Sequence, residues 1–239
     1  MNSLCIYSIW KRYILLFLFV YKTTSHTCNF NIKLIQTLHN EGFHRNITYE
    51  IDYGPYDGDK DWYDNCSVGL EQVLPAGLYA SPDELEKMRY KTTTVFKSKV
   101  DIEVPAELAS PITVHLLSSV QYHKTLMSLP VHARYHKPID GGGYVNVNIP
   151  LPHLYINCGP KKLEKCTSQP VVNSFCPRNI QHRCPWIQVP VAGGAPLSWP
   201  IPRGNTHHHD LVLLGTAAVV FFGSIYLLKE IHSHKTRHK

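Results

Sequence analysis

The sequence predicts a mainly β fold: an antiparallel β-sandwich-like domain followed by a single C-terminal transmembrane helix. Two patterns indicate this organisation. Short runs rich in Val, Ile, Thr and Tyr, separated by Pro and Gly turns, fill the chain after residue 90, and such runs are typical of antiparallel strands. Near the C-terminus, residues 211–228 form an uncharged apolar run, which has the length and composition of a membrane span.

The N-terminal segment has the arrangement of a secretory signal peptide. A basic pair, Lys11 and Arg12, precedes the apolar block Tyr13–Tyr21, and small side chains follow it. We expect cleavage after Ser25, which removes residues 1–25 from the mature protein. An uncleaved signal anchor is the alternative, because apolar residues also precede the basic pair.

The apolar run 211–228 is predicted to cross the membrane with its C-terminal side in the cytosol. At 1.5 Å per residue it reaches roughly 27 Å, close to the thin hydrocarbon core of the endoplasmic reticulum. The tail, residues 229–239, is rich in Lys, Arg and His, and cytosolic flanks carry the excess of positive charge. We therefore expect a single-pass type I protein of the endoplasmic-reticulum membrane, with most of the chain in the lumen.

Between these two ends, we expect one luminal β-rich domain over residues 26–190 and an extended juxtamembrane linker over 191–210. The linker is predicted from its glycines and prolines. A short helix is predicted over Asp83–Tyr90, with Ser81 as its N-cap. The formal net charge of +6 is partly concentrated in the signal segment and the tail, so we do not expect a nucleic-acid partner.

The cysteine count agrees with an oxidising compartment. Cys5 leaves with the signal peptide, and an even number remains, which predicts disulfides whose pairing the sequence alone does not choose. The candidate disulfide cysteines are Cys28, Cys66, Cys158, Cys166, Cys176 and Cys184. A zinc site is disfavoured because no Cys-x-x-Cys occurs.

Two sequons would face the luminal glycosylation machinery in this topology. They are Asn46-Ile-Thr48 and Asn65-Cys-Ser67, and we expect glycans on Asn46 and Asn65. Both asparagines should then lie at the surface of the domain.

The stretch YDGDKDWYDNCS, residues 56–67, is the strongest candidate for a metal site. An EF-hand loop would need a glycine in place of Trp62 and a glutamate in place of Val68. We therefore predict an acidic loop with aromatic anchors, and no metal or cofactor. The alternative is a free-standing luminal metal-dependent glycosyltransferase or hydrolase that uses Asp57, Asp59 and Asp61.

The run VHARYH, residues 131–136, is predicted to be a strand with one packed and one solvated face. Side chains alternate along a strand, so His132, Arg134 and His136 share the polar face, which we expect to be exposed. No nucleophile elbow, phosphate loop or zinc-protease motif occurs in the sequence. These absences favour a binding or scaffolding protein over an enzyme.

Several segments, taken in order along the chain, resemble the PIG-X family, the accessory subunit of GPI mannosyltransferase I. The most specific are LPVHARYHKP (129–138) and LPAGLYASPDEL (74–85). The others are DIEVPAELASP (101–111), LPHLYINC (151–158), CPW (184–186) and IPRGNTHHH (201–209).

This resemblance implies a non-catalytic subunit that stabilises a multi-pass mannosyltransferase of the PIG-M type. That partner transfers the first mannose from dolichol-phosphate-mannose during GPI-anchor biosynthesis. We expect the luminal contact at Arg134, Tyr135, His136 and Pro138. A cell-surface receptor with a disulfide-bonded ectodomain is a further alternative.

Overall fold

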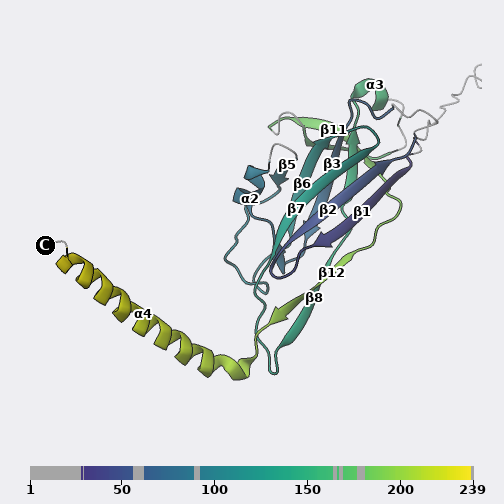
Figure 1. The fold of residues 1–239 in the computed structure, drawn as a ribbon. Coiled ribbons are helices and arrows are strands. Elements are labelled where there is room, and N and C mark those ends of the chain that lie inside the picture. The colour runs from purple at the N-terminus through teal and green to yellow at the C-terminus, as the bar shows by residue number, and fades with distance from the viewer. Residues whose placement is uncertain are drawn as a thin grey trace, which may run out of the picture.

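The computed structural model shows a β-domain with a long helix leaving one end (Figure 1). It describes residues 28–237, with gaps at 29, 56–61, 89–91, 164–165, 167–168 and 177–180. The predicted signal peptide (1–25) and the carboxylates of Asp57, Asp59 and Asp61 lie outside the described residues.

The strands of the domain form two large sheets and one small one, and every strand pairing within them is antiparallel. The first sheet has the order β1-β2-β7-β4: Ile32–His39, His44–Tyr53, Lys124–Ala133 and Leu78–Tyr79. The second has the order β10-β11-β9-β3-β6-β5: Val171–Phe175, Arg183–Val189, His153–Asn157, Ser67–Leu74, Ile112–Ser119 and Thr93–Phe96. The small sheet pairs β12 (Leu197–Arg203) with β8 (Gly143–Ile149).

The two large sheets share one hydrophobic core, which confirms the predicted mainly β, sandwich-like fold. In β2, alternate residues from Ile47 to Tyr53 are buried, and they belong to the same buried cluster as Val68 and Leu70 of β3. One buried polar link crosses this core: the hydroxyl of Tyr49 donates to Oε1 of Gln72 over 2.9 Å. Burial raises the pKa of Tyr49, so this hydroxyl remains a donor.

Four helical segments occur among the described residues: α2 (Pro82–Lys87), α3 (Pro160–Leu163), the 3₁₀ turn η1 (Thr206–His208) and α4 (His209–Arg237). The helix predicted over 83–90 is thus confirmed in position, although α2 ends at Lys87. Ser81 occupies the N-cap position, but its side chain makes no capping hydrogen bond. The buried side chain of Leu85 instead anchors α2 to the core.

Helix α4 is the one described helix that is long and apolar enough to cross a membrane. It has 29 residues, so it extends past the predicted span 211–228 at both ends. At 1.5 Å per residue it is about 44 Å long, compared with a hydrocarbon core of about 30 Å. Its apolar side chains are exposed, as expected for a helix that lies in lipid or against another helix.

The segment 191–210 is not an extended linker, and this prediction is wrong for a physical reason. Residues 197–203 form β12, in which Trp199 and Ile201 are buried in the core, while Pro200 and Pro202 are exposed. Prolines cannot donate hydrogen bonds within a sheet, but they are tolerated at edges. The domain therefore continues through β12 to the start of α4.

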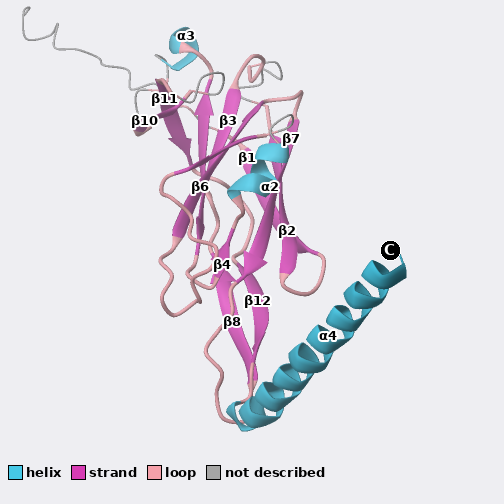
Figure 2. Cartoon of the chain, turned by 90° about the vertical axis from the view of Figure 1, so that its left-hand side faces the viewer, coloured by secondary structure: helices cyan, strands magenta, loops and turns pink. Residues whose placement is uncertain are grey.

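All six candidate cysteines are paired, as predicted. The disulfides are Cys28–Cys166, Cys66–Cys158 and Cys176–Cys184. They lie near α3 and β11, at the end of the domain opposite the start of α4 (Figure 1). We call this the distal end, and we call the end that carries β8, β12 and the start of α4 the proximal end (Figure 2).

Candidate functional site

Residues 132–141, here called the junction segment, connect β7 with the proximal end of the domain. Strand β4 pairs with the end of β7, with Leu78 opposite Ala133 and Tyr79 opposite His132. The two stretches that carry the strongest resemblance to the PIG-X family, 74–85 and 129–138, are therefore packed together. After Ala133 the chain leaves the sheet, and regular side-chain alternation ends with it.

Arg134 is the buried centre of the junction segment. Its side chain is only 3% exposed. Its guanidinium donates to the main-chain oxygens of Val104 and Asp101, each over 2.7 Å, and lies 4.8 Å from the ring centroid of Tyr79. Desolvation lowers the pKa of Arg134, yet a guanidinium stays charged in proteins. The arginine thus fixes the loop that contains Asp101 and Val104 onto β4.

This burial overturns the predicted role of Arg134. We expected its side chain on a solvated face, available to a partner protein. The strand ends at Ala133 and the loop 97–111 covers the following residue, so the guanidinium is enclosed by backbone carbonyls. Arg134 positions the surrounding loops and does not lie on an accessible surface.

The other three predicted contact residues lie closer to solvent. Tyr135 is 79% exposed and its ring lies 5.6 Å from that of Phe43, while Pro138 is also exposed. His136 is half-buried, with Nδ1 3.9 Å from Oε1 of Glu107. Tyr135 and Pro138 therefore form the accessible part of the predicted contact.

A second set of bonds fastens the loop 101–111 to the junction segment. The amide of Ala106 donates to the oxygen of Tyr135 over 3.0 Å, and the amide of Lys137 donates to Oε1 of Glu107. The latter bond is the main reason that the pKa of Glu107 is lowered. The carboxylate therefore remains ionised and keeps accepting this bond near neutral pH.

The end of the junction segment holds the start of α4. The amide of Ile139 donates to the oxygen of Gly204 over 3.0 Å, and the amide of Thr206 donates back to the oxygen of Ile139 over 3.1 Å. Oδ1 of Asn205 accepts from the amides of Gly141 and His207. The β-domain and the apolar helix are thus joined by a hydrogen-bonded corner.

A groove of about 910 Å³ opens at this corner, between the domain and α4. Helix α4 contributes Val212, Leu213 and Thr216 to its lining, together with the polar residues His209 and Asp210 of its first turn, and the domain side contributes Pro138 and Gly204. The exposed junction residue Pro138 is therefore continuous with the first turns of α4.

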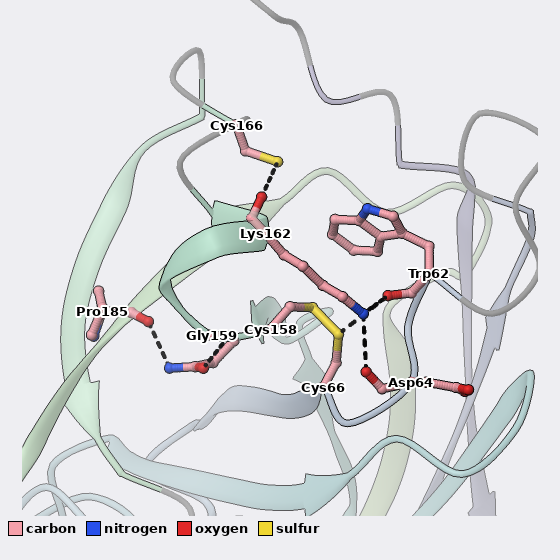
Figure 3. The surroundings of a disulfide bond; sticks show 9 residues. Trp62, Asp64, Cys66, Cys158, Gly159, Lys162, Cys166 and Pro185 are labelled. Carbon is pink, nitrogen blue, oxygen red and sulfur yellow. Dashed lines mark hydrogen bonds between the residues drawn. A yellow bond between two sulfur atoms is a disulfide. The ribbon is translucent and has the colours of Figure 1, made fainter.

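The described part of the acidic stretch is held at the distal end beside the Cys66–Cys158 disulfide (Figure 3). Nζ of Lys162 donates to the main-chain oxygens of Trp62 and Asp64. Tyr63 is buried, 5.0 Å from the ring of Tyr53. The aromatic anchors predicted for this loop are confirmed for Trp62 and Tyr63, while residues 56–61 lie outside the described part of the chain.

The two sequon asparagines have different surroundings. Asn46 lies within β2, is half-buried, and accepts a hydrogen bond of 2.7 Å from Oγ of Ser128. Asn65 is exposed in a turn, with a positive φ of 60°. Asn65 is therefore the more accessible acceptor, and glycosylation at either asparagine stays a prediction.

Sequence reasoning missed one polar cluster, which His44, Glu84 and His132 form on the surface beside β4. Nε2 of His132 lies 2.9 Å from Oε2 of Glu84, and Nε2 of His44 lies 3.1 Å from Oε1. The three residues come from β2, α2 and β7, so no local spacing could reveal them. Only the tertiary fold brings them together.

The structure thus combines a disulfide-linked β-sandwich with one exposed apolar helix that could cross a membrane. The family profile described as PIG-X / PBN1 matches residues 40–232, and the chain belongs to this family. The match includes the β-domain from β2 onward and the predicted membrane span, and it confirms the resemblance found in the sequence.

Relatives in mammals carry a common name. The chain is 26% identical over 211 residues to a Homo sapiens protein named "GPI alpha-1,4-mannosyltransferase I, stabilizing subunit", covering 85% of this chain and 81% of that protein. Proteins of the same name from Mus musculus and Rattus norvegicus are 26% and 25% identical over 216 residues, covering 87% of this chain and 84% of each. The name describes a stabilising subunit and not the catalytic one, in agreement with the predicted accessory role.

Proposed function

We propose that this protein is a non-catalytic stabilising subunit of the GPI mannosyltransferase I complex in the endoplasmic-reticulum membrane. The observation that carries the proposal is the family match over residues 40–232, together with the name shared by relatives that align over more than four fifths of the chain. The catalytic partner is a multi-pass mannosyltransferase of the PIG-M type. It transfers the first mannose from dolichol-phosphate-mannose during GPI-anchor biosynthesis.

The proposed orientation places the β-domain in the lumen and the basic tail, 229–239, in the cytosol. Three disulfides support an oxidising compartment for the domain. The excess of Lys and Arg after the apolar run supports a cytosolic tail. The same orientation exposes Asn65 to the glycosylation machinery.

The partner would be stabilised because this chain binds its folded state and not its unfolded state. A ligand at 100 times its Kd stabilises the state that it binds by about 2.7 kcal/mol. The hydrogen-bonded corner between Ile139 and Gly204 restricts how the β-domain sits on α4. Once α4 has bound the partner within the membrane, the luminal contact becomes intramolecular and is favoured by effective concentration.

The proposed luminal contact is centred on Tyr135 and Pro138, with His136 at its margin. Exposed tyrosines are over-represented among residues that dominate binding energy, and Pro138 leads directly into the groove beside α4. A partner helix that enters this groove would meet Leu213 and Thr216. The adjacent small residue Gly215 leaves open space beside the backbone of α4. Small residues allow helices to approach closely in a membrane.

The experiment that tests the function is native purification from mild detergent, followed by identification of the co-purifying proteins. We expect a multi-pass mannosyltransferase to be recovered, and its half-life to shorten in cells that lack this chain. Surface GPI-anchored proteins should fall in the same cells. Transfer of mannose by this chain when it is purified alone would contradict the proposal. An unchanged level of mannosyltransferase in cells that lack this chain would also contradict it.

The compartment is tested separately by the state of the glycans. Resident proteins of the endoplasmic reticulum keep glycans that are sensitive to endoglycosidase H. We expect the wild-type glycan to be sensitive, and the Asn65→Gln variant to lose a glycan. Resistant glycans at steady state would instead favour the cell-surface receptor alternative.

A further inference from the structure

His44, Glu84 and His132 present three metal-binding atoms, one from each side chain, within 4.8 Å of one another. We propose that they form a binding site for a divalent transition-metal cation of the Zn²⁺ type. The site lies next to the junction segment and joins three elements that are far apart in the sequence. The proposal does not depend on the proposed function.

The ligand set fits Zn²⁺ by type and by number. Two imidazoles and one glutamate are a known three-ligand set for zinc, with water in the fourth position. In a tetrahedral site with bonds of 2.0–2.1 Å, neighbouring ligand atoms lie about 3.3 Å apart. Nε2 of His44 lies 3.1 Å from Oε1 of Glu84, and Nε2 of His132 lies 2.9 Å from the other oxygen, Oε2. The carboxylate is therefore already placed between the imidazoles, and side-chain rotation would bring one of its oxygens to this spacing from both nitrogens.

The two histidine rings must tilt when the ion binds. Their centroids are 4.4 Å apart and their planes are parallel within 4°, whereas a metal ion lies close to the plane of each ring that binds it. Two parallel planes at this separation cannot both contain one ion. His132 also stacks on Tyr79 at 5.0 Å, so the more exposed His44 ring is the one expected to turn.

The side chains are accessible enough to take up an ion from solution. His44 is 55% exposed, Glu84 31% and His132 26%. A bound ion would connect α2 to the start of β2 and the end of β7, and would replace the present hydrogen bonds between Glu84 and the two histidines. It would therefore fix α2 to the four-stranded sheet.

Selectivity should follow from the nitrogen ligands. Imidazole suits Zn²⁺, Co²⁺ and Cu²⁺, whereas Ca²⁺ and Mg²⁺ prefer oxygen ligands. We expect saturable binding of one Zn²⁺ per chain and replacement by Co²⁺ with a visible spectrum of tetrahedral type. Ca²⁺ and Mg²⁺ should not compete.

The test uses the full chain in detergent, stripped with a chelator and titrated with Zn²⁺ by calorimetry. The run His207–His209 offers a competing site, so the background carries His207→Gln, His208→Gln and His209→Gln. Into this background we introduce Glu84→Gln, which preserves side-chain size, and separately His44→Ala. His39→Ala is the matched control, because His39 is also exposed on the four-stranded sheet and bonds only to Thr48 among the described contacts.

We expect Glu84→Gln and His44→Ala each to weaken Zn²⁺ binding by at least 100-fold, since loss of a group that merely hydrogen-bonds to a metal ligand already costs roughly 10–100-fold. His39→Ala should bind Zn²⁺ like the background, and all variants should keep the same far-ultraviolet circular dichroism. Absence of Zn²⁺ binding in the background overturns the proposal. Equal binding in the Glu84→Gln and His39→Ala variants also overturns it, because the zinc would then reside on other histidines.

Discussion

The two ends of the β-domain are stabilised in different ways. At the distal end, three disulfides connect strands and loops that are up to 138 residues apart in the sequence. At the proximal end, the loop 101–111, β4 and the start of α4 are held by hydrogen bonds to the junction segment, with buried Arg134 at the centre. The distal end is therefore held by covalent bonds that need oxidising conditions to form, whereas the proximal end is held by hydrogen bonds around a buried guanidinium.

The largest expected effect is at the distal end. In the chain-entropy estimate, the Cys66–Cys158 bridge, with a sequence separation of 92, stabilises by about 4.6 kcal/mol, and the Cys176–Cys184 bridge, with a separation of 8, by about 2.5 kcal/mol. Replacing the first pair by alanine should therefore lower the unfolding free energy more than replacing the second. Denaturant unfolding in detergent measures both, and equal losses would contradict this ranking.

Arg134→Ala should destabilise the proximal end by about 3 kcal/mol. The change leaves the main-chain oxygens of Val104 and Asp101 without their donors, and buried groups that lose a charged partner carry a large penalty. Arg134→Lys should recover only part of the loss, because lysine lacks the planar fork that reaches both carbonyls.

The readout for Arg134 is the melting temperature together with proteolysis in the loop 97–111. Lys137→Ala is the control, since the Lys137 side chain is exposed and only its main-chain amide bonds to Glu107. Wild-type stability in Arg134→Ala would show that the guanidinium does not hold the loop.

A smaller effect is expected from His115, which lies on the six-stranded sheet away from the junction. Burial lowers the pKa of His115, and Lys97 and Arg183 lower it further, against an opposing contribution from Glu71. The unfolded chain therefore takes up this proton at higher pH than the folded one, so the histidine contributes full stability above about pH 6.5 and loses it as the pH falls.

The His115→Gln variant should have a shallower decline in stability between about pH 7 and pH 5. One proton contributes at most about 1.4 kcal/mol per pH unit. Melting temperatures across this range, compared with those of the wild type, measure the difference. An unchanged or steeper decline would contradict the assignment to His115.

The strands were predictable from the sequence wherever apolar and polar residues alternate regularly. Ile47, Tyr49, Ile51 and Tyr53 alternate with polar residues and are buried, so β2 could have been predicted although strands were expected mainly after residue 90. In β12 buried and exposed residues alternate in the same way, but two of the exposed positions are prolines, which gives the segment the composition of a linker. Nothing local distinguishes a proline-rich edge strand from an extended tail, because the difference depends on whether Trp199 has a core to enter.

The candidate site was less predictable, because its contacts join distant segments. Strand periodicity placed Arg134 on a polar face, and it could not show that β7 ends at Ala133 or that the loop 97–111 returns to cover the guanidinium. The number of cysteines predicted disulfides, but only the fold selects their pairing. The cluster of His44, Glu84 and His132 has no signature in sequence at all.

Each end of the β-domain carries an exposed tyrosine on its surface. Tyr135, in the junction segment, is 79% exposed, and Tyr122, in the distal turn between β6 and β7, is 90% exposed. Neither side chain is part of the core, so replacing either by glutamate should leave the stability of this chain unchanged within about 0.5 kcal/mol. Tyr135 belongs to the junction segment, which also contains the groove-lining residue Pro138, whereas Tyr122 lies at the other end of the domain.

Binding of the partner at the proximal end is tested most directly by the amount of catalytic mannosyltransferase that is recovered with the Tyr135→Glu variant and with the Tyr122→Glu variant, at matched levels of this chain. Loss of a dominant interface residue costs about 2 kcal/mol, or roughly 30-fold in Kd. We expect strongly reduced recovery of the mannosyltransferase with Tyr135→Glu and wild-type recovery with Tyr122→Glu. Equal recovery with both variants, whether high or low, would contradict a partner surface at the proximal end.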